Sequence, residues 1–318
     1  MEKIAVLTSG GDSQGMNSAI RAIVRTGIAH GFEMIGVRRG FKGLMENDFI
    51  TLGTSDVSDI LYRGGTFLQS ARSDEFKTEA GQNKAINNLH EHGIEHLVVI
   101  GGDGSYRGAQ ALFNRGIKTY GLPGTIDNDI PLTDYTIGFD TTLNVVTNAI
   151  SNLRDTMSSH ERVSVIEVMG RSCGDIALQA GISSGVDAVL IPEFEWDIKE
   201  ISDQLAKGFQ RGKTHSIVMV AEGAGTAEDV ASLIEKHSDL DTRPTVLGHI
   251  QRGGIPTAFD RIFTSRMGHK VIELIENEIT GVALGMEKNE ITYHSFDDIF
   301  DSENVVDKHL YQIFQDLI

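Results

Sequence analysis

The feature that most constrains the fold is an alternation of short apolar runs with longer amphipathic segments along all 318 residues. The apolar runs predict strands at 3–8, 33–37, 96–100, 118–121, 163–168, 188–191, 216–221, 245–247 and 281–284. Helical periodicity predicts helices at 16–30, 79–92, 105–114, 141–156, 198–210, 227–237, 259–277 and 305–314. Buried strands that alternate with amphipathic helices are typical of a mostly parallel sheet covered on both faces. The chain is therefore predicted to be an α/β protein.

Glycine-containing turns follow the predicted strands again and again. The chain has 35 glycines and only 5 prolines. The turns are LTSGGD (7–12), VIGGDG (99–104), GLPGTIDND (121–129), EVMGRS (167–172), VAEGAG (220–225) and VLGHIQRGG (246–254). In open α/β sheets, ligands bind beyond the carboxyl ends of the strands. Six such turns predict two Rossmann-like lobes whose mostly parallel sheets face each other across a cleft.

The net negative charge of the chain argues against nucleic acid and anionic membranes as ligands. Lys plus Arg number 28 and Asp plus Glu number 45, which gives a net charge of −17. Such a field disfavours nucleic acid and anionic membranes, so anionic metabolites must be bound by local arginines, amides or a metal. The one cysteine, Cys173, permits no disulfide within the chain. Neither a signal-peptide pattern nor an apolar run of the ~20 residues that span a bilayer is present.

Two of the turns resemble phosphate-binding loops without matching the common fingerprints. TSGGD (8–12) and IGGDGS (100–105) contain neither GxxxxGK[ST] nor GxGxxG. Glycines between a strand and a helix let backbone amides approach a phosphate. Asp103 can hold Mg²⁺ together with nucleotide phosphates, because Mg²⁺ takes few protein ligands. The structural alternatives are a tight turn for the first motif, and for Asp103 a cap on the helix that starts near Ser105.

The segment GTIDND (124–129) is the densest acidic cluster of the chain. Asp127 and Asp129 lie two apart, so in an extended segment they point the same way. One carboxylate could accept a proton from a substrate hydroxyl while the other supports a metal. In phosphoryl transfer the transition state is loose, so an Asp with an ordinary low pKa is adequate. The alternative is a turn rich in Asn and Asp.

Several cations stand in or beside the turns, where an anion could meet them. They are Arg72, Arg162, Arg171, Arg243 and Arg252, with His249 beside the last. Arg21 and Arg25 share one helix face, and Arg154, Arg211 and Lys213 are further candidates for an anion site. Arginine binds phosphate bidentately, although any one of these residues taken alone could be an ordinary surface charge.

Taken together and in order, the motifs resemble those of the bacterial ATP-dependent 6-phosphofructokinases. The motifs are TSGGD, RGGT (63–66), AR (71–72), GGDGS, PGTIDND, TIGFDT (136–141), SHER (159–162), EVMGR, GDIAL (174–178), AEG (221–223) and LGHIQRGG. The resemblance runs from Met1 to the region of Ala258 and continues more weakly beyond. It implies transfer of the ATP γ-phosphoryl group to the 1-hydroxyl of fructose 6-phosphate.

The resemblance also assigns roles to particular positions of this chain. It implies an ATP site at Gly11, Arg72, Ser73, Gly102, Asp103, Gly104 and Ser105, with Mg²⁺ on Asp103. It implies Asp127 as general base, with Thr125, Asp129, Gly11, Arg72 and Arg171 as the other catalytic positions. For the sugar phosphate it implies Thr125, Asp127, Arg162, Met169, Gly170, Arg171, Glu222, Arg243, His249 and Arg252. Arg162 and Arg243 would reach the substrate of a neighbouring subunit.

Organisation and regulation follow from the same resemblance. It implies an ATP-binding lobe at 1–138 plus about 251–301, and a sugar-phosphate-binding lobe at about 139–250 plus 302–318. It implies a cytoplasmic homotetramer with an interface site for ADP or phosphoenolpyruvate. That effector site would contain Arg21, Arg25, Asp59, Arg154, Gly185, Asp187, Arg211 and Lys213. Thr54 replaces an Arg of some members, and Asp187 a Glu of many, which should weaken effector binding.

Three other functions compete with this interpretation. A pyrophosphate-dependent phosphofructokinase commonly carries Asp and Lys at the positions of Gly104 and Gly124, so the two glycines favour ATP. Lipid and NAD kinases share the GGDG loop but are not expected to combine PGTIDND with LGHIQRGG. A non-catalytic sugar-phosphate sensor would be expected to have lost Asp127, Asp103 or Arg171, and all three are present.

Overall fold

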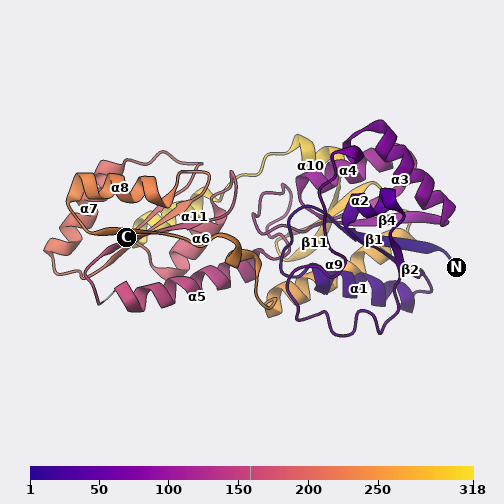
Figure 1. Cartoon of the computed structure of the whole chain (residues 1–318), viewed down its shortest axis with the longest axis horizontal. Helices are drawn as coiled ribbons and strands as arrows, with labels where there is room; N and C mark the ends of the chain where they lie inside the picture. The colour runs from indigo at the N-terminus through magenta and orange to yellow at the C-terminus, as the bar shows by residue number, and fades with distance from the viewer. Residues whose placement is uncertain (158) are drawn as a thin grey trace. The chain divides into compact units, whose positions relative to one another are not determined.

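The computed structural model describes residues 1–157 and 159–318, and the chain divides into two compact units. Unit 1 comprises Met1–Ile126, Ile130–Thr141 and Arg252–Asn304. Unit 2 comprises Asp127–Asp129, Thr142–Gln251 and Val305–Ile318. Each unit is an α/β layer structure with its own sheet, as the alternation in the sequence predicts (Figure 1).

Unit 1 contains a seven-stranded sheet in the order β11-β10-β5-β4-β1-β2-β3. The strands are β1 (Lys3–Thr8), β2 (Glu33–Val37), β3 (Phe49–Thr51), β4 (Ile94–Gly101), β5 (Lys118–Pro123), β10 (Val282–Glu287) and β11 (Glu290–Ser295). The two edge strands β3 and β11 are antiparallel to their neighbours, and the other pairs are parallel. The five inner strands therefore end at one edge of the sheet, where the glycine turns begin.

Helices cover both faces of the first sheet. The helices are α1 (Met16–Ala29), α2 (Gly40–Glu46), α3 (Glu79–Glu91), α4 (Asp103–Phe113), α9 (Ala258–Glu276) and α10 (Phe296–Asp301). On one face α1 and α9 lie side by side, and residues such as Ile20 and Met267 bury their side chains against the strands (Figure 1). On the other face, α2, α3, α4 and α10 bury residues such as Leu89 and Tyr106.

Unit 2 contains a four-stranded, fully parallel sheet in the order β7-β8-β6-β9. Its strands are β6 (Val163–Val168), β7 (Ala188–Leu190), β8 (Ser216–Ala221) and β9 (Thr242–Val246). Its helices are α5 (Phe139–Met157, which starts in unit 1), α6 (Asp175–Ser184), α7 (Ile198–Gln210), α8 (Ala227–Ser238) and α11 (Lys308–Leu317). Helices α7 and α8 pack Leu205, Val230 and Ile234 against the strands. No helix within the described residues is long and apolar enough to cross a membrane.

The differences from the predicted elements lie mainly at the sheet edges and in short helices. The edge strands β3 and β11 and the helices α2, α6 and α10 are absent from the predicted set. Strand β11 forms a tight hairpin with β10, in which Lys288 and Asn289 both adopt positive φ angles, 50° and 67°. A two-residue turn of this kind matches the twist of the strands, and Asn favours it. The Asn in the segment EKNE (287–290) therefore indicates this hairpin in the sequence.

Candidate active site

In unit 1 the turns after β1, β4 and β5 lie together because their strands are parallel neighbours. The amide of Ser9 donates to the carbonyl of Ile100 at 2.9 Å, and the amide of Gly124 donates to the carbonyl of Gly101 at 3.1 Å. The hydroxyl of Ser70 donates to the carbonyl of Gly10 at 2.6 Å. Segments far apart in the sequence are thus joined through the main chain at one end of the sheet.

The glycines of the turn after β4 have two different roles. A Cβ on Gly101 would lie 2.4 Å from Oγ of the buried Ser105 and 2.5 Å from the carbonyl oxygen of Ser9, so this position has no room for a side chain. A Cβ on Gly104 would meet nothing within 4 Å, and one on Gly102 would approach only Thr125, at 3.8 Å. Gly101 therefore closes the turn, whereas Gly102 and Gly104 leave open space along the backbone that a phosphate could occupy.

Helix α4 begins at Asp103, two residues before Ser105, and its N-cap position is occupied by Gly102. The structural alternative, that Asp103 caps a helix starting near Ser105, is therefore wrong. Its half-exposed carboxylate accepts from Nε of Arg107 at 3.1 Å, one turn along the helix. Such exposed pairs contribute only about 0.3–0.5 kcal/mol, so they do not compete strongly with a divalent cation. An accessible carboxylate beside open, glycine-lined space fits Mg²⁺, which binds through one or two carboxylates and phosphate oxygens.

The other residues predicted to bind the nucleotide, Gly11, Arg72 and Ser73, differ in their surroundings. Gly11 faces Arg252, because a Cβ on Gly11 would lie 2.7 Å from Nη1 of that arginine. Nη1 of Arg252 also donates to the carbonyl of Asp12 at 2.9 Å. The contacts of Arg252 thus place it in unit 1. Arg72 is exposed, and the hydroxyl of Ser73 accepts from the amide of Phe76 at 3.3 Å.

In unit 2 the central feature is a buried carboxylate beside an exposed guanidinium. Asp127 is 1% exposed, and its Oδ2 lies 3.3 Å from Nε of Arg171. The main chain of Arg171 is held in place because its amide donates to Oε1 of Glu222 at 2.8 Å. Gly170 and Arg171 have φ angles of 135° and 53°. The first of these values is readily adopted only by glycine, which explains Gly170 in the EVMGR motif.

Close packing also explains Gly223 of the AEG motif. A Cβ on Gly223 would lie 2.1 Å from the carbonyl oxygen of Arg171. The turn after β8 therefore contacts the turn after β6 through its backbone. This contact and the Glu222 hydrogen bond together fix the direction in which the Arg171 side chain leaves the main chain.

Two sets of supporting residues were missed by the sequence analysis. Gln251 is fully buried; its Oε1 accepts from the amide of Met169 at 3.1 Å, and its Nε2 donates to the carbonyl of Gly248 at 3.0 Å. Asn128 follows the buried Asp127 and donates to Oδ2 of Asp175 at 2.8 Å. Burial raises the pKa of Asp175, partly offset by this hydrogen bond. Gln251 lies within LGHIQRGG and Asn128 within PGTIDND, so the motifs marked the positions but not the contacts.

The remaining predicted sugar-phosphate residues of unit 2 are more exposed. Asp241 joins two of them, since its carboxylate oxygens lie 2.8 Å from Nε of Arg162 and 2.8 Å from Nη2 of Arg243. His249 is exposed on a short 3₁₀ helix, Gly248–Arg252, and Asp129 is half-buried.

Cys173 is buried, and burial raises the pKa of its thiol to about 12. It is therefore protonated at neutral pH and no nucleophile.

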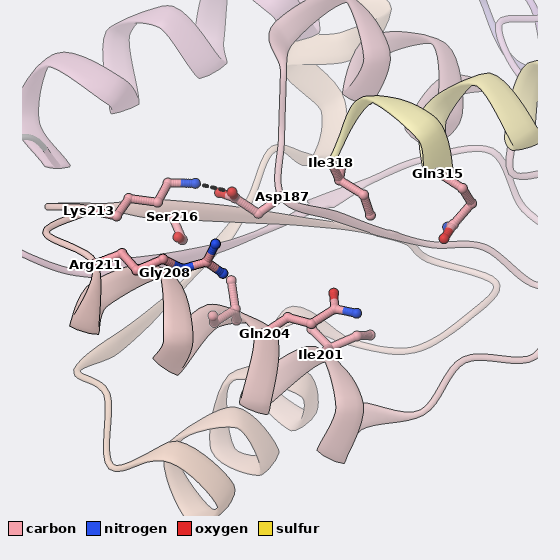
Figure 2. Close-up of a pocket in the computed structure, with 10 residues that line it drawn as sticks. Asp187, Ile201, Gln204, Gly208, Arg211, Lys213, Ser216, Gln315 and Ile318 are labelled. Atoms are coloured by element: carbon pink, nitrogen blue, oxygen red, sulfur yellow. Dashed lines mark hydrogen bonds and ion pairs between the residues drawn. The ribbon is translucent and has the colours of Figure 1, made fainter.

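Three of the predicted effector residues line a pocket of about 570 Å³ in unit 2 (Figure 2). They are Asp187, Arg211 and Lys213, and the pocket is completed by α7 and by Gln315 and Ile318 at the chain end. Lys213 forms an ion pair with Asp187, which also accepts from the amide of Ile217 at 2.8 Å.

The other predicted effector residues lie elsewhere in the two units. Arg154 donates to the carbonyls of Ser184 and Gly185 in unit 2. Arg21 and Arg25 lie on α1 of unit 1, and Arg25 donates to the carbonyl of Thr54 at 3.3 Å. Asp59 is exposed in the same unit. Thr54, one of the noted departures, thus contacts Arg25 through its main chain.

The fold is that of an α/β protein of two units, with open glycine turns and arginines at the ends of its parallel strands. The family model named Phosphofructokinase matches residues 3–275. An ATP-dependent 6-phosphofructokinase from Shouchella clausii is 52% identical over 317 residues, covering 100% of this chain and 99% of that protein. One from Clostridium tetani is 52% identical over 313 residues, covering 98% of each chain. The chain therefore belongs to the phosphofructokinase family.

Solved structures agree in fold. A phosphofructokinase from Saccharomyces cerevisiae matches with a TM-score of 0.91 and 33% identity over 99% of this chain. The present chain spans 50% of the length of that yeast chain. A pyrophosphate-dependent phosphofructokinase from Marinobacter aquaeolei matches with a TM-score of 0.86 at 20% identity, over 100% of this chain and 92% of its own. The fold is thus shared by proteins with different phosphoryl donors.

Proposed function

We propose that the protein transfers the γ-phosphoryl group of ATP to the 1-hydroxyl of fructose 6-phosphate, a reaction of glycolysis. Unit 1 is the ATP-binding lobe and unit 2 is the sugar-phosphate-binding lobe. The observation that carries the proposal is the buried Asp127 carboxylate beside Arg171. The full-length relatives named ATP-dependent 6-phosphofructokinase, at 52% identity, support ATP as the donor.

The nucleotide residues of the proposal are Gly11, Arg72, Ser73 and Gly102–Ser105. The open space beside Gly102 and Gly104 supports this assignment, because the phosphates need a close approach to the backbone. Asp103 would hold Mg²⁺, with support from Asp129. When bound, Mg²⁺ neutralises charge on the phosphates of the nucleotide.

Asp127 accepts the proton of the sugar hydroxyl as that oxygen attacks the phosphorus atom. Arg171 pairs with Asp127, and its exposed guanidinium stabilises negative charge on the transferring group. Thr125 lies two residues before the base. Met169, Gly170, Glu222, His249 and Arg252 bind the sugar phosphate, with Glu222 holding the main chain of Arg171.

Arg162 and Arg243 bind the 6-phosphate in the active site of a neighbouring subunit. Their common partner Asp241 holds the two guanidinium groups near each other, as a shared phosphate contact requires. The active form in this proposal is a cytoplasmic homotetramer.

The pocket lined by Asp187, Arg211 and Lys213 binds the effector, ADP or phosphoenolpyruvate, at an interface between subunits. Arg21, Arg25, Asp59, Arg154 and Gly185 complete that interface site in this proposal. Two cations near one carboxylate suit a phosphorylated ligand. The ion pair of Lys213 with Asp187 must be exchanged when such a ligand binds. Because Asp187 is short and position 54 has no cation, the response to effectors is expected to be weak.

The direct test is a coupled assay of fructose 6-phosphate phosphorylation with Mg-ATP and, separately, with Mg-pyrophosphate. We expect turnover with ATP and little with pyrophosphate; robust turnover with pyrophosphate would contradict the donor assignment. Arms with ADP and with phosphoenolpyruvate test the effector pocket. No turnover with either donor from folded protein would favour the sensor function instead.

The role of Asp127 has its own test. Asp127→Ala removes the group that accepts the hydroxyl proton, so turnover should fall by about 10²–10⁴-fold, the usual contribution of a general base. Binding of fructose 6-phosphate, measured by calorimetry, should be largely retained. Turnover that survives this substitution would show that the base is another residue.

A further inference from the structure

At the amino end of the first sheet, opposite to the glycine turns, two carboxylates and an imidazole converge. Glu2 precedes β1, and Glu95 and His96 lie near the start of β4. One ligand atom from each of the three residues lies within 4.8 Å of the others. In the part of the chain that the structure describes, this is the one such group of three. None of these residues has a role in the proposed phosphoryl transfer.

An irregularity in the sheet helps to bring the group together. In the pairing of β1 with β4, Lys3 stands opposite Ile94 but Ile4 stands opposite His96, so Glu95 is an extra residue. Successive residues of a regular strand point to opposite faces. A bulge breaks this alternation and re-aims a side chain. It thereby allows the adjacent Glu95 and His96 to present ligand atoms to the same site.

His96 is the anchor of this cluster, because it is 2% exposed and both of its ring nitrogens have polar neighbours. Nε2 lies 2.8 Å from Oε1 of Glu2, and Nδ1 lies 3.0 Å from the hydroxyl of Tyr120. A tyrosine hydroxyl can accept or donate, so the imidazole can carry its proton on either nitrogen. With the proton on Nδ1, the lone pair of Nε2 faces the Glu2 carboxylate.

This arrangement has the parts of a metal site. A metal-binding histidine usually donates its other N–H to a fixed partner, here the Tyr120 hydroxyl. A neutral imidazole with two carboxylates is a donor set that suits Zn²⁺, with a position left for water.

One cation already stands at the edge of the cluster. Nζ of Lys118 lies 3.5 Å from Oε2 of Glu95, and the lysine is 37% exposed at its side chain. An ammonium on a flexible stem can turn into solvent when a divalent ion arrives. We propose that Glu2, Glu95 and His96 form a binding site for one Zn²⁺-class divalent cation, which links the chain start to β4.

The test is a calorimetric titration of the full-length, metal-free protein with Zn²⁺, in the presence of excess Mg²⁺ to occupy the oxygen-only sites. We expect one micromolar site per chain. Glu2→Gln and Glu95→Gln change exposed side chains and should keep the fold, but each should weaken this site by at least tenfold. His96→Gln should abolish it. Lys118→Met should strengthen it several-fold, because a competing cation is removed.

A matched control is His294→Gln. His294 also pairs with a glutamate, Glu287, at 2.7 Å, but it does not belong to a group of three ligands. Zinc binding at the Glu2–Glu95–His96 cluster should be unchanged in this variant. Phosphotransfer in the absence of zinc should be unchanged in Glu2→Gln and Glu95→Gln.

Nuclear magnetic resonance of ¹⁵N-histidine-labelled protein provides a second readout. Zinc should shift the Nε2 resonance of His96, identified by its loss in His96→Gln, and leave the proton on Nδ1. The proposal is overturned if the wild-type protein has no such site, or if zinc binds Glu2→Gln and Glu95→Gln as tightly as it binds the wild type.

Discussion

The turn after β4 in unit 1 and the turn after β6 in unit 2 both follow a parallel strand, but they present different chemistry. The first exposes main chain, because Gly102 and Gly104 leave open space where side chains would stand. The second presents charged side chains, with Arg171 beside the buried Asp127. The same strand-and-turn unit can thus offer either backbone amides or a positioned guanidinium, depending on where its glycines fall.

The comparison extends to two buried carboxylates. Asp260 of unit 1, on α9, accepts from the amides of Gly138 and Thr141 and from the hydroxyl of Thr141. Asp127 of unit 2 lies beside a guanidinium. Two amides and a hydroxyl therefore hold the Asp260 carboxylate, whereas a guanidinium lies beside the Asp127 carboxylate. Asp260 is suited to fixing the start of α5, and Asp127 is suited to accepting a proton in a reaction.

Apart from the loss already expected for Asp127→Ala, the largest effect is expected at Arg171. Arg171→Ala should lower kcat by about 10²–10³-fold, the usual cost of removing one group that stabilises transition-state charge. The KM for ATP should change little, since the nucleotide residues lie in unit 1. Steady-state kinetics checks both values. Arg171→Lys should recover only part of the loss, and a change confined to the KM for ATP would break the proposed division of roles.

The burial of Asp260 should make the free energy of unfolding depend on pH. Burial raises its pKa from 3.8 to about 6, although three hydrogen bonds oppose the shift. A carboxyl whose pKa is raised on folding contributes most to the free energy of unfolding below pH 4, where it is protonated in both the folded and the unfolded state. This contribution is lost as the pH rises through 6, and the free energy of unfolding should fall by about 3 kcal/mol as a result.

The measurement is the unfolding free energy of wild type and Asp260→Asn by urea denaturation at several pH values. The advantage of wild type over the variant should be larger at pH 4 than at pH 7. A constant difference would mean that Asp260 ionises as easily in the folded protein as in the unfolded chain.

The two kinds of glycine in the turn after β4 should respond differently to alanine. Gly101→Ala forces a Cβ against Ser105 and the Ser9 carbonyl, and such overpacking costs about 1–3 kcal/mol of stability. Gly104→Ala meets no neighbour and should leave the urea midpoint nearly unchanged while raising the KM for ATP. Equal loss of stability in both variants would show that the space beside Gly104 is not open.

The smallest effect is expected at Asp241, which holds Arg162 and Arg243 together. Exposed ion pairs contribute about 0–1 kcal/mol, so Asp241→Ala should change the KM for fructose 6-phosphate by roughly two- to fivefold. The exposed Asp203 on α7 offers a control, and Asp203→Ala should leave this KM unchanged. An effect of Asp241→Ala on the KM for ATP alone would argue against the sugar-phosphate role.

Local patterns determined the alternation of strands and helices and the positions of the turns. Apolar runs and helical periodicity depend on neighbours in the sequence, so the parallel inner strands and most helices could be read from it. The ordered motifs led to the phosphofructokinase family, which the family match and the full-length relatives confirm. The glycines were also readable as sites of close approach, but not which of them are packed and which border open space.

Only the tertiary structure decided the contacts between distant residues. The hydrogen bond from Met169 to Gln251 joins residues 82 positions apart, and that from Asn128 to Asp175 joins residues 47 positions apart. The Glu2–Glu95–His96 cluster depends on the register between β1 and β4. Register and burial are properties of the assembled sheet, which no local window of sequence contains. A buried glutamine or histidine looks like a surface residue in the sequence, because its burial depends on which strands and helices pack around it.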